Sequence, residues 1–424
     1  MLRIDQLYVQ NPHWNTGLWP KAPTYRRHLF VKLWNHVEQM KLMIYLIGAR
    51  RTGKSVLLRQ IVENLLDRKI TSPKQILWWE FSADSTTKDI EDVFENYYRE
   101  IVDPEQAAYV FFDEVQYADG YEVVIKQLYD LYEGRIKFFL TGSLSLSYKR
   151  RMQESMLGRF LPYRLFPLSF EEYLELLNDS VKLSQYKRIK SEENVAIKKH
   201  MASTMSNSFR EFLAWGRFPE TVGRSQDSAG LYLDTTASLA LGQDAFSYFN
   251  IHRPGELTNL YEYFKVNSGG IISISSLAKN ASAETISNYL DILELMGLVY
   301  FVYNSTNPIA KNNVARKAYV NSAFYLRATK HNLSTSFGFA TESYILERLL
   351  ERGQEVTFWH NRRQEIDFLL PREKMAFEVK FRSQLGDPKV LKIFAQKNNF
   401  QSTVITLDTW ETKEGIKYLP ACLF

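Results

Sequence analysis

Gly48-Ala49-Arg50-Arg51-Thr52-Gly53-Lys54-Ser55 is the stretch of sequence that decides the fold of the first part of this chain. An unbroken apolar run over residues 42–47 precedes it, and apolar residues recur at helical spacing from Ser55 to Lys69 after it. A buried strand, a glycine loop and an amphipathic helix in this order fit the pattern G-x-x-x-x-G-K-[ST] of a phosphate-binding loop. The glycines let backbone N–H groups turn toward phosphates, and the helix adds the positive end of its dipole.

The residue types of this loop predict how it would hold ATP and Mg²⁺. We expect residues 48–55 to contact the nucleotide, with Lys54 bridging the β- and γ-phosphates. Ser55 would offer its hydroxyl to Mg²⁺, a hard ion that prefers oxygen ligands. The alternative is a fortuitous glycine turn before an ordinary helix, and the strand-loop-helix context favours the phosphate-binding loop.

A second apolar run, residues 109–112, ends in two carboxylates, Asp113 and Glu114. A buried strand followed by two acids is the Walker B arrangement of ATPases. Asp113 would hold the Mg²⁺ shell, and Glu114 would orient and deprotonate the attacking water. Alternatively, two acids at a strand end simply face solvent.

A third apolar run, residues 138–140, ends in Thr141-Gly142-Ser143. Thr141 and Ser143 are therefore candidates to sense the γ-phosphate at a strand tip, although hydroxyl residues also occur there for turn chemistry alone. With a further strand over residues 75–81, these runs alternate with helical stretches. The alternation predicts an α/β domain with a parallel sheet covered on both faces.

Length and composition bound the rest of the molecule. A chain of 424 residues exceeds the size of a single hydrophobic core, so we expect two to four domains. The net charge of +5 is a mild basic bias, compatible with nucleic acid without requiring it. We find no signal-peptide pattern and no 18-residue apolar run, so we expect a cytoplasmic protein with no membrane segment. The single cysteine, Cys422, excludes an internal disulfide.

Several short motifs together resemble one family of proteins. They are Arg26-Arg27, the loop at 48–55, Phe112-Asp113-Glu114, Leu140-Thr141-Gly142-Ser143, Leu157-Gly158-Arg159 and Phe166-Pro167-Leu168-Ser169-Phe170. In this combination the chain resembles, over nearly its whole length, a family of prokaryotic AAA-type P-loop ATPases. In that family the ATPase is joined to a C-terminal domain similar to the PD-(D/E)XK nucleases.

The resemblance implies that Arg159 is an arginine finger that reaches the nucleotide of a neighbouring subunit, which requires a homo-oligomer such as a hexamer. Alternatively, Arg159 forms an ion pair within its own subunit. The helical lid departs from the family pattern Gly-Gly-x-Pro, since this chain has Gly216-Arg217-Phe218-Pro219. Nucleotide sensing at this motif is therefore an open question.

The middle of the chain combines a helical lid with a winged helix-turn-helix pattern. Residues 181–200 carry six Lys or Arg and two Glu, which suits a solvated connector or a DNA contact. Residues 274–302 read as a short helix, a turn, a longer helix and a strand. The longer helix offers Glu284, Asn288 and Asp291 but no Lys or Arg, so its attraction for phosphates is weak. DNA reading and use as a protein interface both remain open.

Four residues near the C-terminus have the spacing of a nuclease site. In the helical stretch 339–352, Glu342 shares the apolar stripe that faces the core. Asp367 alternates with apolar residues on one predicted strand, and Glu378 and Lys380 share one face of the next. Two paired strands and a helix can therefore present all four side chains together.

This set resembles the PD-(D/E)XK signature. In that signature Glu342, Asp367 and Glu378 would bind Mg²⁺, which activates water, and Lys380 would assist cleavage. Neighbouring arginines would hold DNA phosphates or are ordinary surface charge, namely Arg362, Arg363 and Arg382. Alternatively, the nuclease fold serves as a binding platform and the acid-lysine set is a buried ion pair.

The sequence thus predicts an α/β protein of four parts: a P-loop AAA ATPase domain at 1–165, a helical lid at 166–250, a winged helix-turn-helix at 251–310 and a C-terminal α/β PD-(D/E)XK nuclease-like domain at 311–424. We expect an oligomeric ATPase that moves or remodels DNA, for instance branched DNA, and cuts it with a metal. The alternative is a nucleotide-switched regulator that binds a protein partner and carries an inactive nuclease fold.

Overall fold

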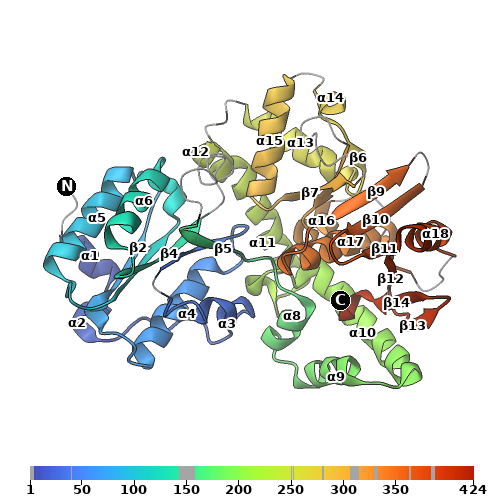
Figure 1. The fold of residues 1–424 in the computed structure, drawn as a ribbon, viewed down its shortest axis with the longest axis horizontal. Helices are drawn as coiled ribbons and strands as arrows, with labels where there is room; N and C mark the ends of the chain where they lie inside the picture. The colour runs from blue at the N-terminus through green and yellow to red at the C-terminus, as the bar shows by residue number, and fades with distance from the viewer. Residues whose placement is uncertain are drawn as a thin grey trace. The chain divides into compact units, whose positions relative to one another are not determined.

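The computed structural model describes residues 4–39, 41–142, 158–249, 251, 253–278, 281–305, 315–328, 333–361, 364–382 and 387–424. The chain forms two compact units, whose helices and strands are labelled in Figure 1. The first unit comprises Met1–Leu165 and Gly242–His252, and the second comprises Phe166–Leu241 and Arg253–Phe424. The short segment 242–252 therefore leaves the second unit and packs with the first.

The first unit is built on a five-stranded sheet in the order β2-β3-β4-β1-β5. Every pairing in it is parallel, and the predicted parallel sheet is thereby confirmed. The strands are β1 (Met43–Ile47), β2 (Ile76–Glu80), β3 (Ala108–Asp113), β4 (Ile136–Gly142) and β5 (Phe160–Arg164).

Helices cover both faces of this sheet (Figure 1). They are α1 (Ile4–Gln10), α2 (His13–Thr16), α3 (Leu29–Trp34), α4 (Lys54–Asp67), α5 (Thr87–Glu100) and α6 (Tyr121–Tyr132), with short 3-10 turns η1 (Pro73–Gln75) and η2 (Val115–Tyr117). Tyr45 packs with α5 and α6 on one face, whereas Leu46 packs with α3 and α4 on the other. Because neighbouring side chains of a strand point to opposite faces, a strand covered on both faces is apolar at every position.

The second unit contains a nine-stranded mixed sheet in the order β13-β14-β12-β11-β10-β9-β7-β8-β6. Its strands are β6 (Ile271–Ile272), β7 (Val299–Asn304), β8 (Arg316–Val320), β9 (Thr357–Asn361), β10 (Gln364–Leu370), β11 (Met375–Lys380), β12 (Gln401–Thr406), β13 (Glu411–Lys413) and β14 (Ile416–Pro420). Its helices are α8 (Phe170–Leu176), α9 (Ser180–Ser191), α10 (Val195–Trp215), η4 (Pro219–Thr221), α11 (Gln226–Leu239), α13 (Pro254–Val266), α14 (Ile274–Leu277), α15 (Ala283–Leu295), α16 (Ser322–Ala328), α17 (Leu333–Glu351), α18 (Lys389–Asn398) and η6 (Ala421–Leu423).

One sheet joins segments that the sequence pattern separates at residue 310. Strand β7 pairs with β8 antiparallel and with β9 parallel, so strands from both sides of that boundary are hydrogen-bonded neighbours. The predicted order of short helix, longer helix and strand appears as α14, α15 and β7. Strand pairing between distant segments has no local signature in the sequence, so the sequence pattern did not reveal this sheet. Whether α15 contacts DNA or a protein stays a prediction.

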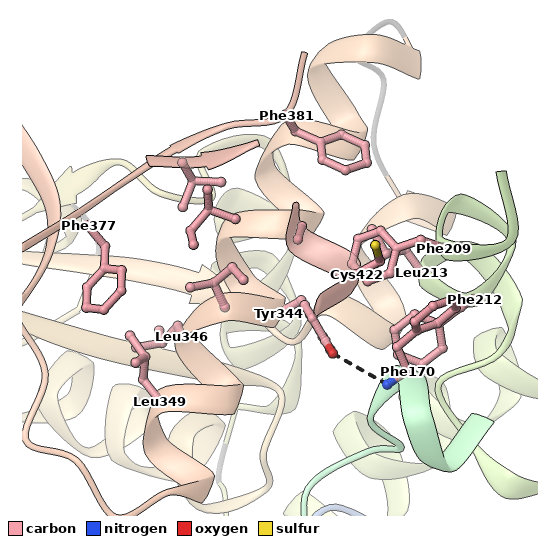
Figure 2. Packing of buried hydrophobic residues seen from close by; sticks show 14 of the residues in the cluster. Phe170, Phe209, Phe212, Leu213, Tyr344, Leu346, Leu349, Phe377, Phe381 and Cys422 are labelled. Atoms are coloured by element: carbon pink, nitrogen blue, oxygen red, sulfur yellow. Dashed lines mark hydrogen bonds between the residues drawn. The ribbon is translucent and has the colours of Figure 1, made fainter. Parts of the chain in front are cut away.

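Aromatic rings connect the helices of the predicted lid to the C-terminal helix α17 in one core (Figure 2). The ring of Phe209 lies 5.3 Å from that of Phe170 and 5.4 Å from that of Tyr344, between centroids. The Phe170 N–H donates to the Tyr344 hydroxyl oxygen at 3.4 Å. Offset and edge-to-face ring pairs at such distances add to the free energy gained from burial.

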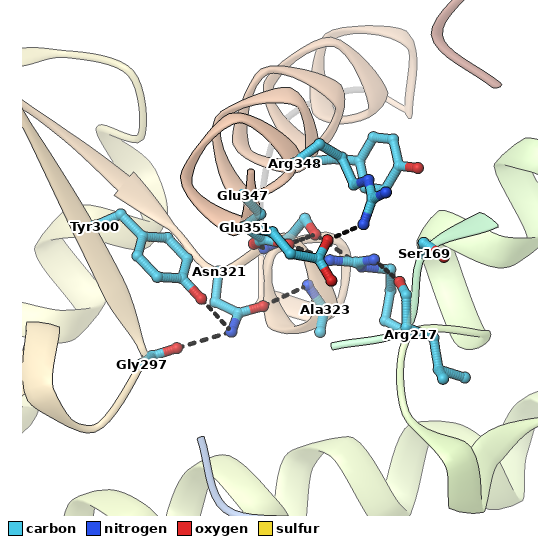
Figure 3. Close-up of polar contacts among 12 residues, drawn as sticks. Ser169, Arg217, Gly297, Tyr300, Asn321, Ala323, Glu347, Arg348 and Glu351 are labelled. Carbon is cyan, nitrogen blue, oxygen red and sulfur yellow. Dashed lines mark hydrogen bonds and ion pairs between the residues drawn. The ribbon is translucent and has the colours of Figure 1, made fainter. Parts of the chain in front are cut away.

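Arg217, the residue that departs from the lid pattern of the family, is a buried anchor of the second unit (Figure 3). Its guanidinium pairs with Glu347 of α17, donates to the backbone oxygen of Leu168 and donates from Nε to Ser322 Oγ at 3.0 Å. Glu347 also accepts the Ser322 N–H at 2.9 Å. The arginine therefore makes structural contacts inside the second unit.

Candidate functional site

The predicted nucleotide site lies where three parallel strands end. β1 pairs with β4, and β4 pairs with β3, so the residues that follow these strands lie along one edge of the sheet. In α/β sheets, ligands bind at the carboxyl ends of the strands. The glycine loop, the Asp113-Glu114 pair and Thr141 all belong to this edge.

The backbone of the glycine loop requires its glycines at two positions. A Cβ added to Gly48 would lie 2.3 Å from the backbone oxygen of Leu165, a distance that no side chain tolerates. Gly53 has φ +99°, a conformation that L side chains rarely adopt, immediately before Lys54 begins α4. The strand-loop-helix geometry predicted from the sequence is thus present.

Buried hydrogen bonds hold the centre of the loop. The hydroxyl of Thr52, which is fully buried, donates to the backbone oxygen of Ala49 at 2.9 Å. The Arg27 guanidinium donates to the Thr52 backbone oxygen at 2.9 Å. Arg27 belongs to the Arg26-Arg27 motif before the first strand, and its contact gives that motif a physical role in fixing the loop.

Lys54 holds its ammonium group at the loop. The side chain is 6% exposed, and Nζ donates to the backbone oxygens of Gly48 at 3.1 Å and Ala49 at 3.3 Å. A buried ammonium at the N-terminus of a helix is well placed to neutralise phosphate charge. Its contact with the phosphates themselves, like the contacts of Arg51 and Gly53, stays a prediction.

Thr141 connects the tip of β4 to the two acids at the end of β3. Its hydroxyl donates to Asp113 Oδ1 and accepts the Glu114 N–H at 2.9 Å. The threonine therefore orients both acids, a role that goes beyond turn chemistry at a strand tip. Phosphate sensing by Thr141 stays a prediction, and Ser143 lies outside the residues that the structure describes.

Asp113 and Ser55 have the chemistry of a magnesium site. Asp113 is fully buried, and its Oδ2 has no hydrogen-bond partner among the described residues. Burial raises the pKa of Asp113 to about 6, and hydrogen bonds from Thr141 and Ser55 counteract this rise. A buried carboxylate oxygen and a hydroxyl beside a phosphate-binding loop fit Mg²⁺, which uses few protein oxygens together with the phosphates of a nucleotide.

Glu114 is held in an uncommon backbone conformation. Its φ of +54° and ψ of +40° lie in the left-handed region, which a non-glycine residue enters at a cost of roughly 1 kcal/mol. The amide of Gln116, which is 7% exposed, donates to the Glu114 carboxylate. Sequence reasoning missed Gln116, although its position two residues after the second acid was a visible signal.

A third segment of chain reaches the loop from far away in the sequence. Asp244 pairs with Arg50, the third residue of the loop, across 194 positions of sequence. Sequence reasoning missed Asp244, because nothing local to residues 240–249 points to the loop. The structure thus adds an acid to the predicted site.

Arg159 makes a contact within its own subunit. Its Nε donates to Asp130 Oδ1 at 2.7 Å, and its side chain is 32% exposed. The ion pair matches the structural alternative considered for this residue. Contact with a neighbouring subunit stays a prediction.

The four residues with nuclease spacing converge in the second unit. Lys380 Nζ lies 2.8 Å from Glu378 Oε1, and Asp367 Oδ2 accepts the Val379 N–H at 2.8 Å, which places these groups together on β10 and β11. Burial raises the pKa of Glu342 to about 8, and the Asp367 carboxylate adds to the rise. Metal binding and catalysis by these four residues stay predictions.

Lys317 of β8 also lies in this cluster, and sequence reasoning missed it. The side chain is 1% exposed, its Nζ pairs with Glu365 and lies 3.4 Å from Asp367 Oδ1. Burial opposes its charge, yet Tyr319 and the surrounding carboxylates raise the pKa of Lys317 well above its usual value. A fixed ammonium group therefore neutralises Asp367, one of the acids that the nuclease prediction assigned to a metal.

The cluster consequently fits Mg²⁺ poorly. Across the described part of the chain, no three Asp, Glu, His or Cys side chains are arranged to hold a metal ion. Of the predicted DNA-contacting arginines, Arg382 is exposed after β11, whereas Arg362 and Arg363 lie outside the described residues. Metal binding by Glu342, Asp367 and Glu378 thus gains no support from the arrangement of these residues.

Comparison with protein families supports the assignment of the first unit. Residues 40–174 match the family model of an AAA domain. Residues 206–329 and 337–423 match two domains of unknown function, DUF8612 and DUF4143. The first match supports an AAA-type ATPase domain, and the other two name no activity.

Two relatives cover most of the chain. An uncharacterized protein of Haemophilus influenzae is 22% identical over 390 residues, which are 87% of this chain and 89% of the relative. The uncharacterized protein MJ1544 of Methanocaldococcus jannaschii is 26% identical over 373 residues, 84% of this chain and 77% of the relative.

Solved structures share a more distant likeness. The Aeropyrum pernix Orc1 protein in complex with DNA has a TM-score of 0.33 at 11% identity, covering 81% of this chain and 97% of that one. A point mutant of Thermotoga maritima RuvB has a TM-score of 0.30 at 14% identity, covering 71% of this chain and 93% of that one. Likeness at these TM-scores decides nothing about this chain.

Among the described helices, none is long and apolar enough to cross a membrane.

Proposed function

We propose that this protein hydrolyses ATP with Mg²⁺ at the loop of residues 48–55. The observation that carries the proposal is the hydrogen-bonded set Asp113, Glu114 and Thr141 at the strand ends, on the same edge as the buried ammonium of Lys54. Phosphoryl transfer needs positioning and charge neutralisation more than covalent chemistry, and these residues supply both.

Each residue has a distinct role in this proposal. Lys54 neutralises charge that develops on the transferred phosphoryl group, and Glu114 accepts a proton from the attacking water while Gln116 fixes the orientation of its carboxylate. Asp113 and Ser55 would hold Mg²⁺, which would supply positive charge that neutralises the phosphates.

Glu114→Gln should reduce ATP turnover about a hundredfold to a thousandfold while ATP binding persists, because an amide can orient water but cannot accept its proton. Phosphate release and the binding of a fluorescent ATP analogue would be measured side by side. The matched control is Glu91→Gln, which changes an exposed acid on α5 and should alter neither phosphate release nor analogue binding. Normal turnover in Glu114→Gln would assign the base elsewhere.

The second part of the proposal is the use of this hydrolysis on DNA by a homo-oligomer. Lys187 and Arg188 of α9 are exposed and offer charge for phosphates. Arg159 lies at the surface, and in an oligomer it would exchange Asp130 for the nucleotide of a neighbouring subunit. ATP hydrolysis stimulated by branched or duplex DNA, and weakened by salt, would support this use.

One observation favours the rival role for the C-terminal part. Because Lys317 already neutralises Asp367 and Glu365, this part of the protein works better as a binding platform than as a metal-dependent nuclease. In this second candidate function, the ATPase is a nucleotide-switched regulator, and the C-terminal part binds a protein partner.

The wild-type protein should therefore leave single-stranded, duplex and branched DNA uncut in the presence of Mg²⁺ or Mn²⁺. Asp367→Ala should instead lower the free energy of unfolding by about 1–3 kcal/mol, because it removes one partner of the buried ammonium. Gel analysis of DNA and urea unfolding would measure the two effects. Cleavage that requires both the metal and Asp367 would restore the nuclease assignment.

A further inference from the structure

We propose that Asp244 is a positioning residue of the nucleotide site. Through its ion pair with Arg50, nucleotide binding changes how firmly the glycine loop holds the chain segment that links the two units. We call residues 242–252 the return segment, because the chain re-enters the first unit there. The inference rests on the proposed function, since it takes loop 48–55 as the phosphate site. It adds a third element to the two motifs found in the sequence.

The return segment reaches the two catalytic motifs of the first unit. A π-helical turn, η5 (Ala240–Asp244), ends at Asp244, and α12 (Ala245–Phe249) then packs against η2, the turn that follows Glu114. Asp244 itself pairs with Arg50 in the glycine loop. One short segment therefore contacts both the phosphate-binding loop and the turn that follows the proposed base Glu114.

The contact between Asp244 and Arg50 is largely shielded from water. The Asp244 side chain is 9% exposed, and that of Arg50 is 35% exposed. Burial raises the pKa of Asp244, and Arg50 and Lys54 counteract the rise while Glu114 adds to it. Asp244 is thus close enough to interact electrostatically with Lys54 and with the proposed base Glu114.

A nucleotide would bring several negative charges to this loop. The phosphates attract Arg50 and repel Asp244, so the anion and the carboxylate compete for one guanidinium. The Asp244 carboxylate therefore weakens nucleotide binding. Bound nucleotide in turn weakens the ion pair between Arg50 of the loop and Asp244 of the return segment. This mutual dependence follows from thermodynamic linkage between two sites.

The chain connectivity gives this competition a consequence beyond the site. The return segment follows α11 and precedes α13, both of which belong to the second unit. When the loop releases Asp244, the two connections to the second unit gain freedom. The Arg50–Asp244 pair is thus a physical route by which the state of the nucleotide reaches the rest of the protein.

Asp244→Asn tests the proposal in the full-length chain. We expect the Kd of a fluorescent ADP analogue to fall about tenfold, and kcat to fall because product release becomes slower. The control variant is Asp227→Asn, which changes an exposed acid on α11 and should alter neither value. In an Arg50→Ala background the effect of Asp244→Asn on Kd should shrink to less than about twofold, because the shared partner is gone.

The outcomes separate this proposal from the one on which it rests. If the wild-type protein binds nucleotide and Asp244→Asn binds it with the same Kd, the positioning role is wrong while the ATPase assignment stands. If Asp244→Asn changes Kd equally in the wild-type and the Arg50→Ala backgrounds, the positioning role is also wrong. If the wild-type protein binds no nucleotide, the proposed function itself fails. A lower melting temperature with an unchanged Kd would assign Asp244 a purely structural role.

Discussion

Lys54→Ala is expected to abolish ATP hydrolysis, with a loss of roughly a thousandfold or more, and to weaken ATP binding. The ammonium group lies at the loop, 3.1 Å from the Gly48 backbone oxygen, and is almost fully buried. In such a place a positive charge interacts with phosphates far more strongly than it would in water. Removing it takes away charge neutralisation in both the bound state and the transition state.

The comparison variant for this prediction is Lys88→Ala, which removes an exposed lysine from α5. Thermal unfolding of both proteins would be recorded first, because Lys54→Ala removes a buried donor from two backbone oxygens of the loop and a loss of folding must be told apart from a loss of turnover. Phosphate release under saturating ATP and the Kd of an ATP analogue would be measured for each. Wild-type turnover in Lys54→Ala would reject the phosphate-binding loop.

Arg217→Ala is expected to cost the second unit about 3–5 kcal/mol of folding free energy. The substitution leaves the Glu347 carboxylate buried at 1% exposure without its charged partner. It also removes the hydrogen bonds to Leu168 and Ser322 and opens a space beside the Phe212 and Tyr344 rings. An uncompensated buried charge is among the costliest single changes in a protein.

Urea unfolding of Arg217→Ala would be compared with that of Arg224→Ala, which breaks an exposed pair with Glu220. The exposed pair should contribute less than about 1 kcal/mol, because water screens it. The double variant Arg217→Met with Glu347→Gln should recover part of the lost stability, since the buried charge is then gone. A loss below about 1 kcal/mol in Arg217→Ala would contradict the role of an interior anchor.

The sequence signals of the proposed nucleotide site are local. Each catalytic candidate follows an apolar run directly, and the carboxyl ends of parallel strands meet at one edge. Strands β1, β3 and β4 and the loop at 48–55 are therefore recognisable without any knowledge of tertiary contacts. Strand alternation and helical spacing likewise led to the prediction that Glu342, Asp367, Glu378 and Lys380 lie near one another.

Contacts across long stretches of sequence were beyond such reasoning. Lys317 enters the acid cluster across 50 positions, Arg217 reaches Glu347 across 130, and Asp244 reaches Arg50 across 194. Each of these side chains looks like ordinary surface charge in its local context. Burial is decided by which segments pack together, and a buried charge must find a partner wherever the fold supplies one.

By itself, then, the sequence determined the strand-loop-helix architecture and the parallel sheet of the first unit, because hydrophobic periodicity and loop chemistry act over a few neighbouring residues. Only the tertiary structure decided that Lys317 pairs with Glu365 and Asp367 and that Asp244 pairs with Arg50 of the glycine loop. Electrostatic interactions depend on distance in space and on burial, and these quantities exist only once the chain has folded.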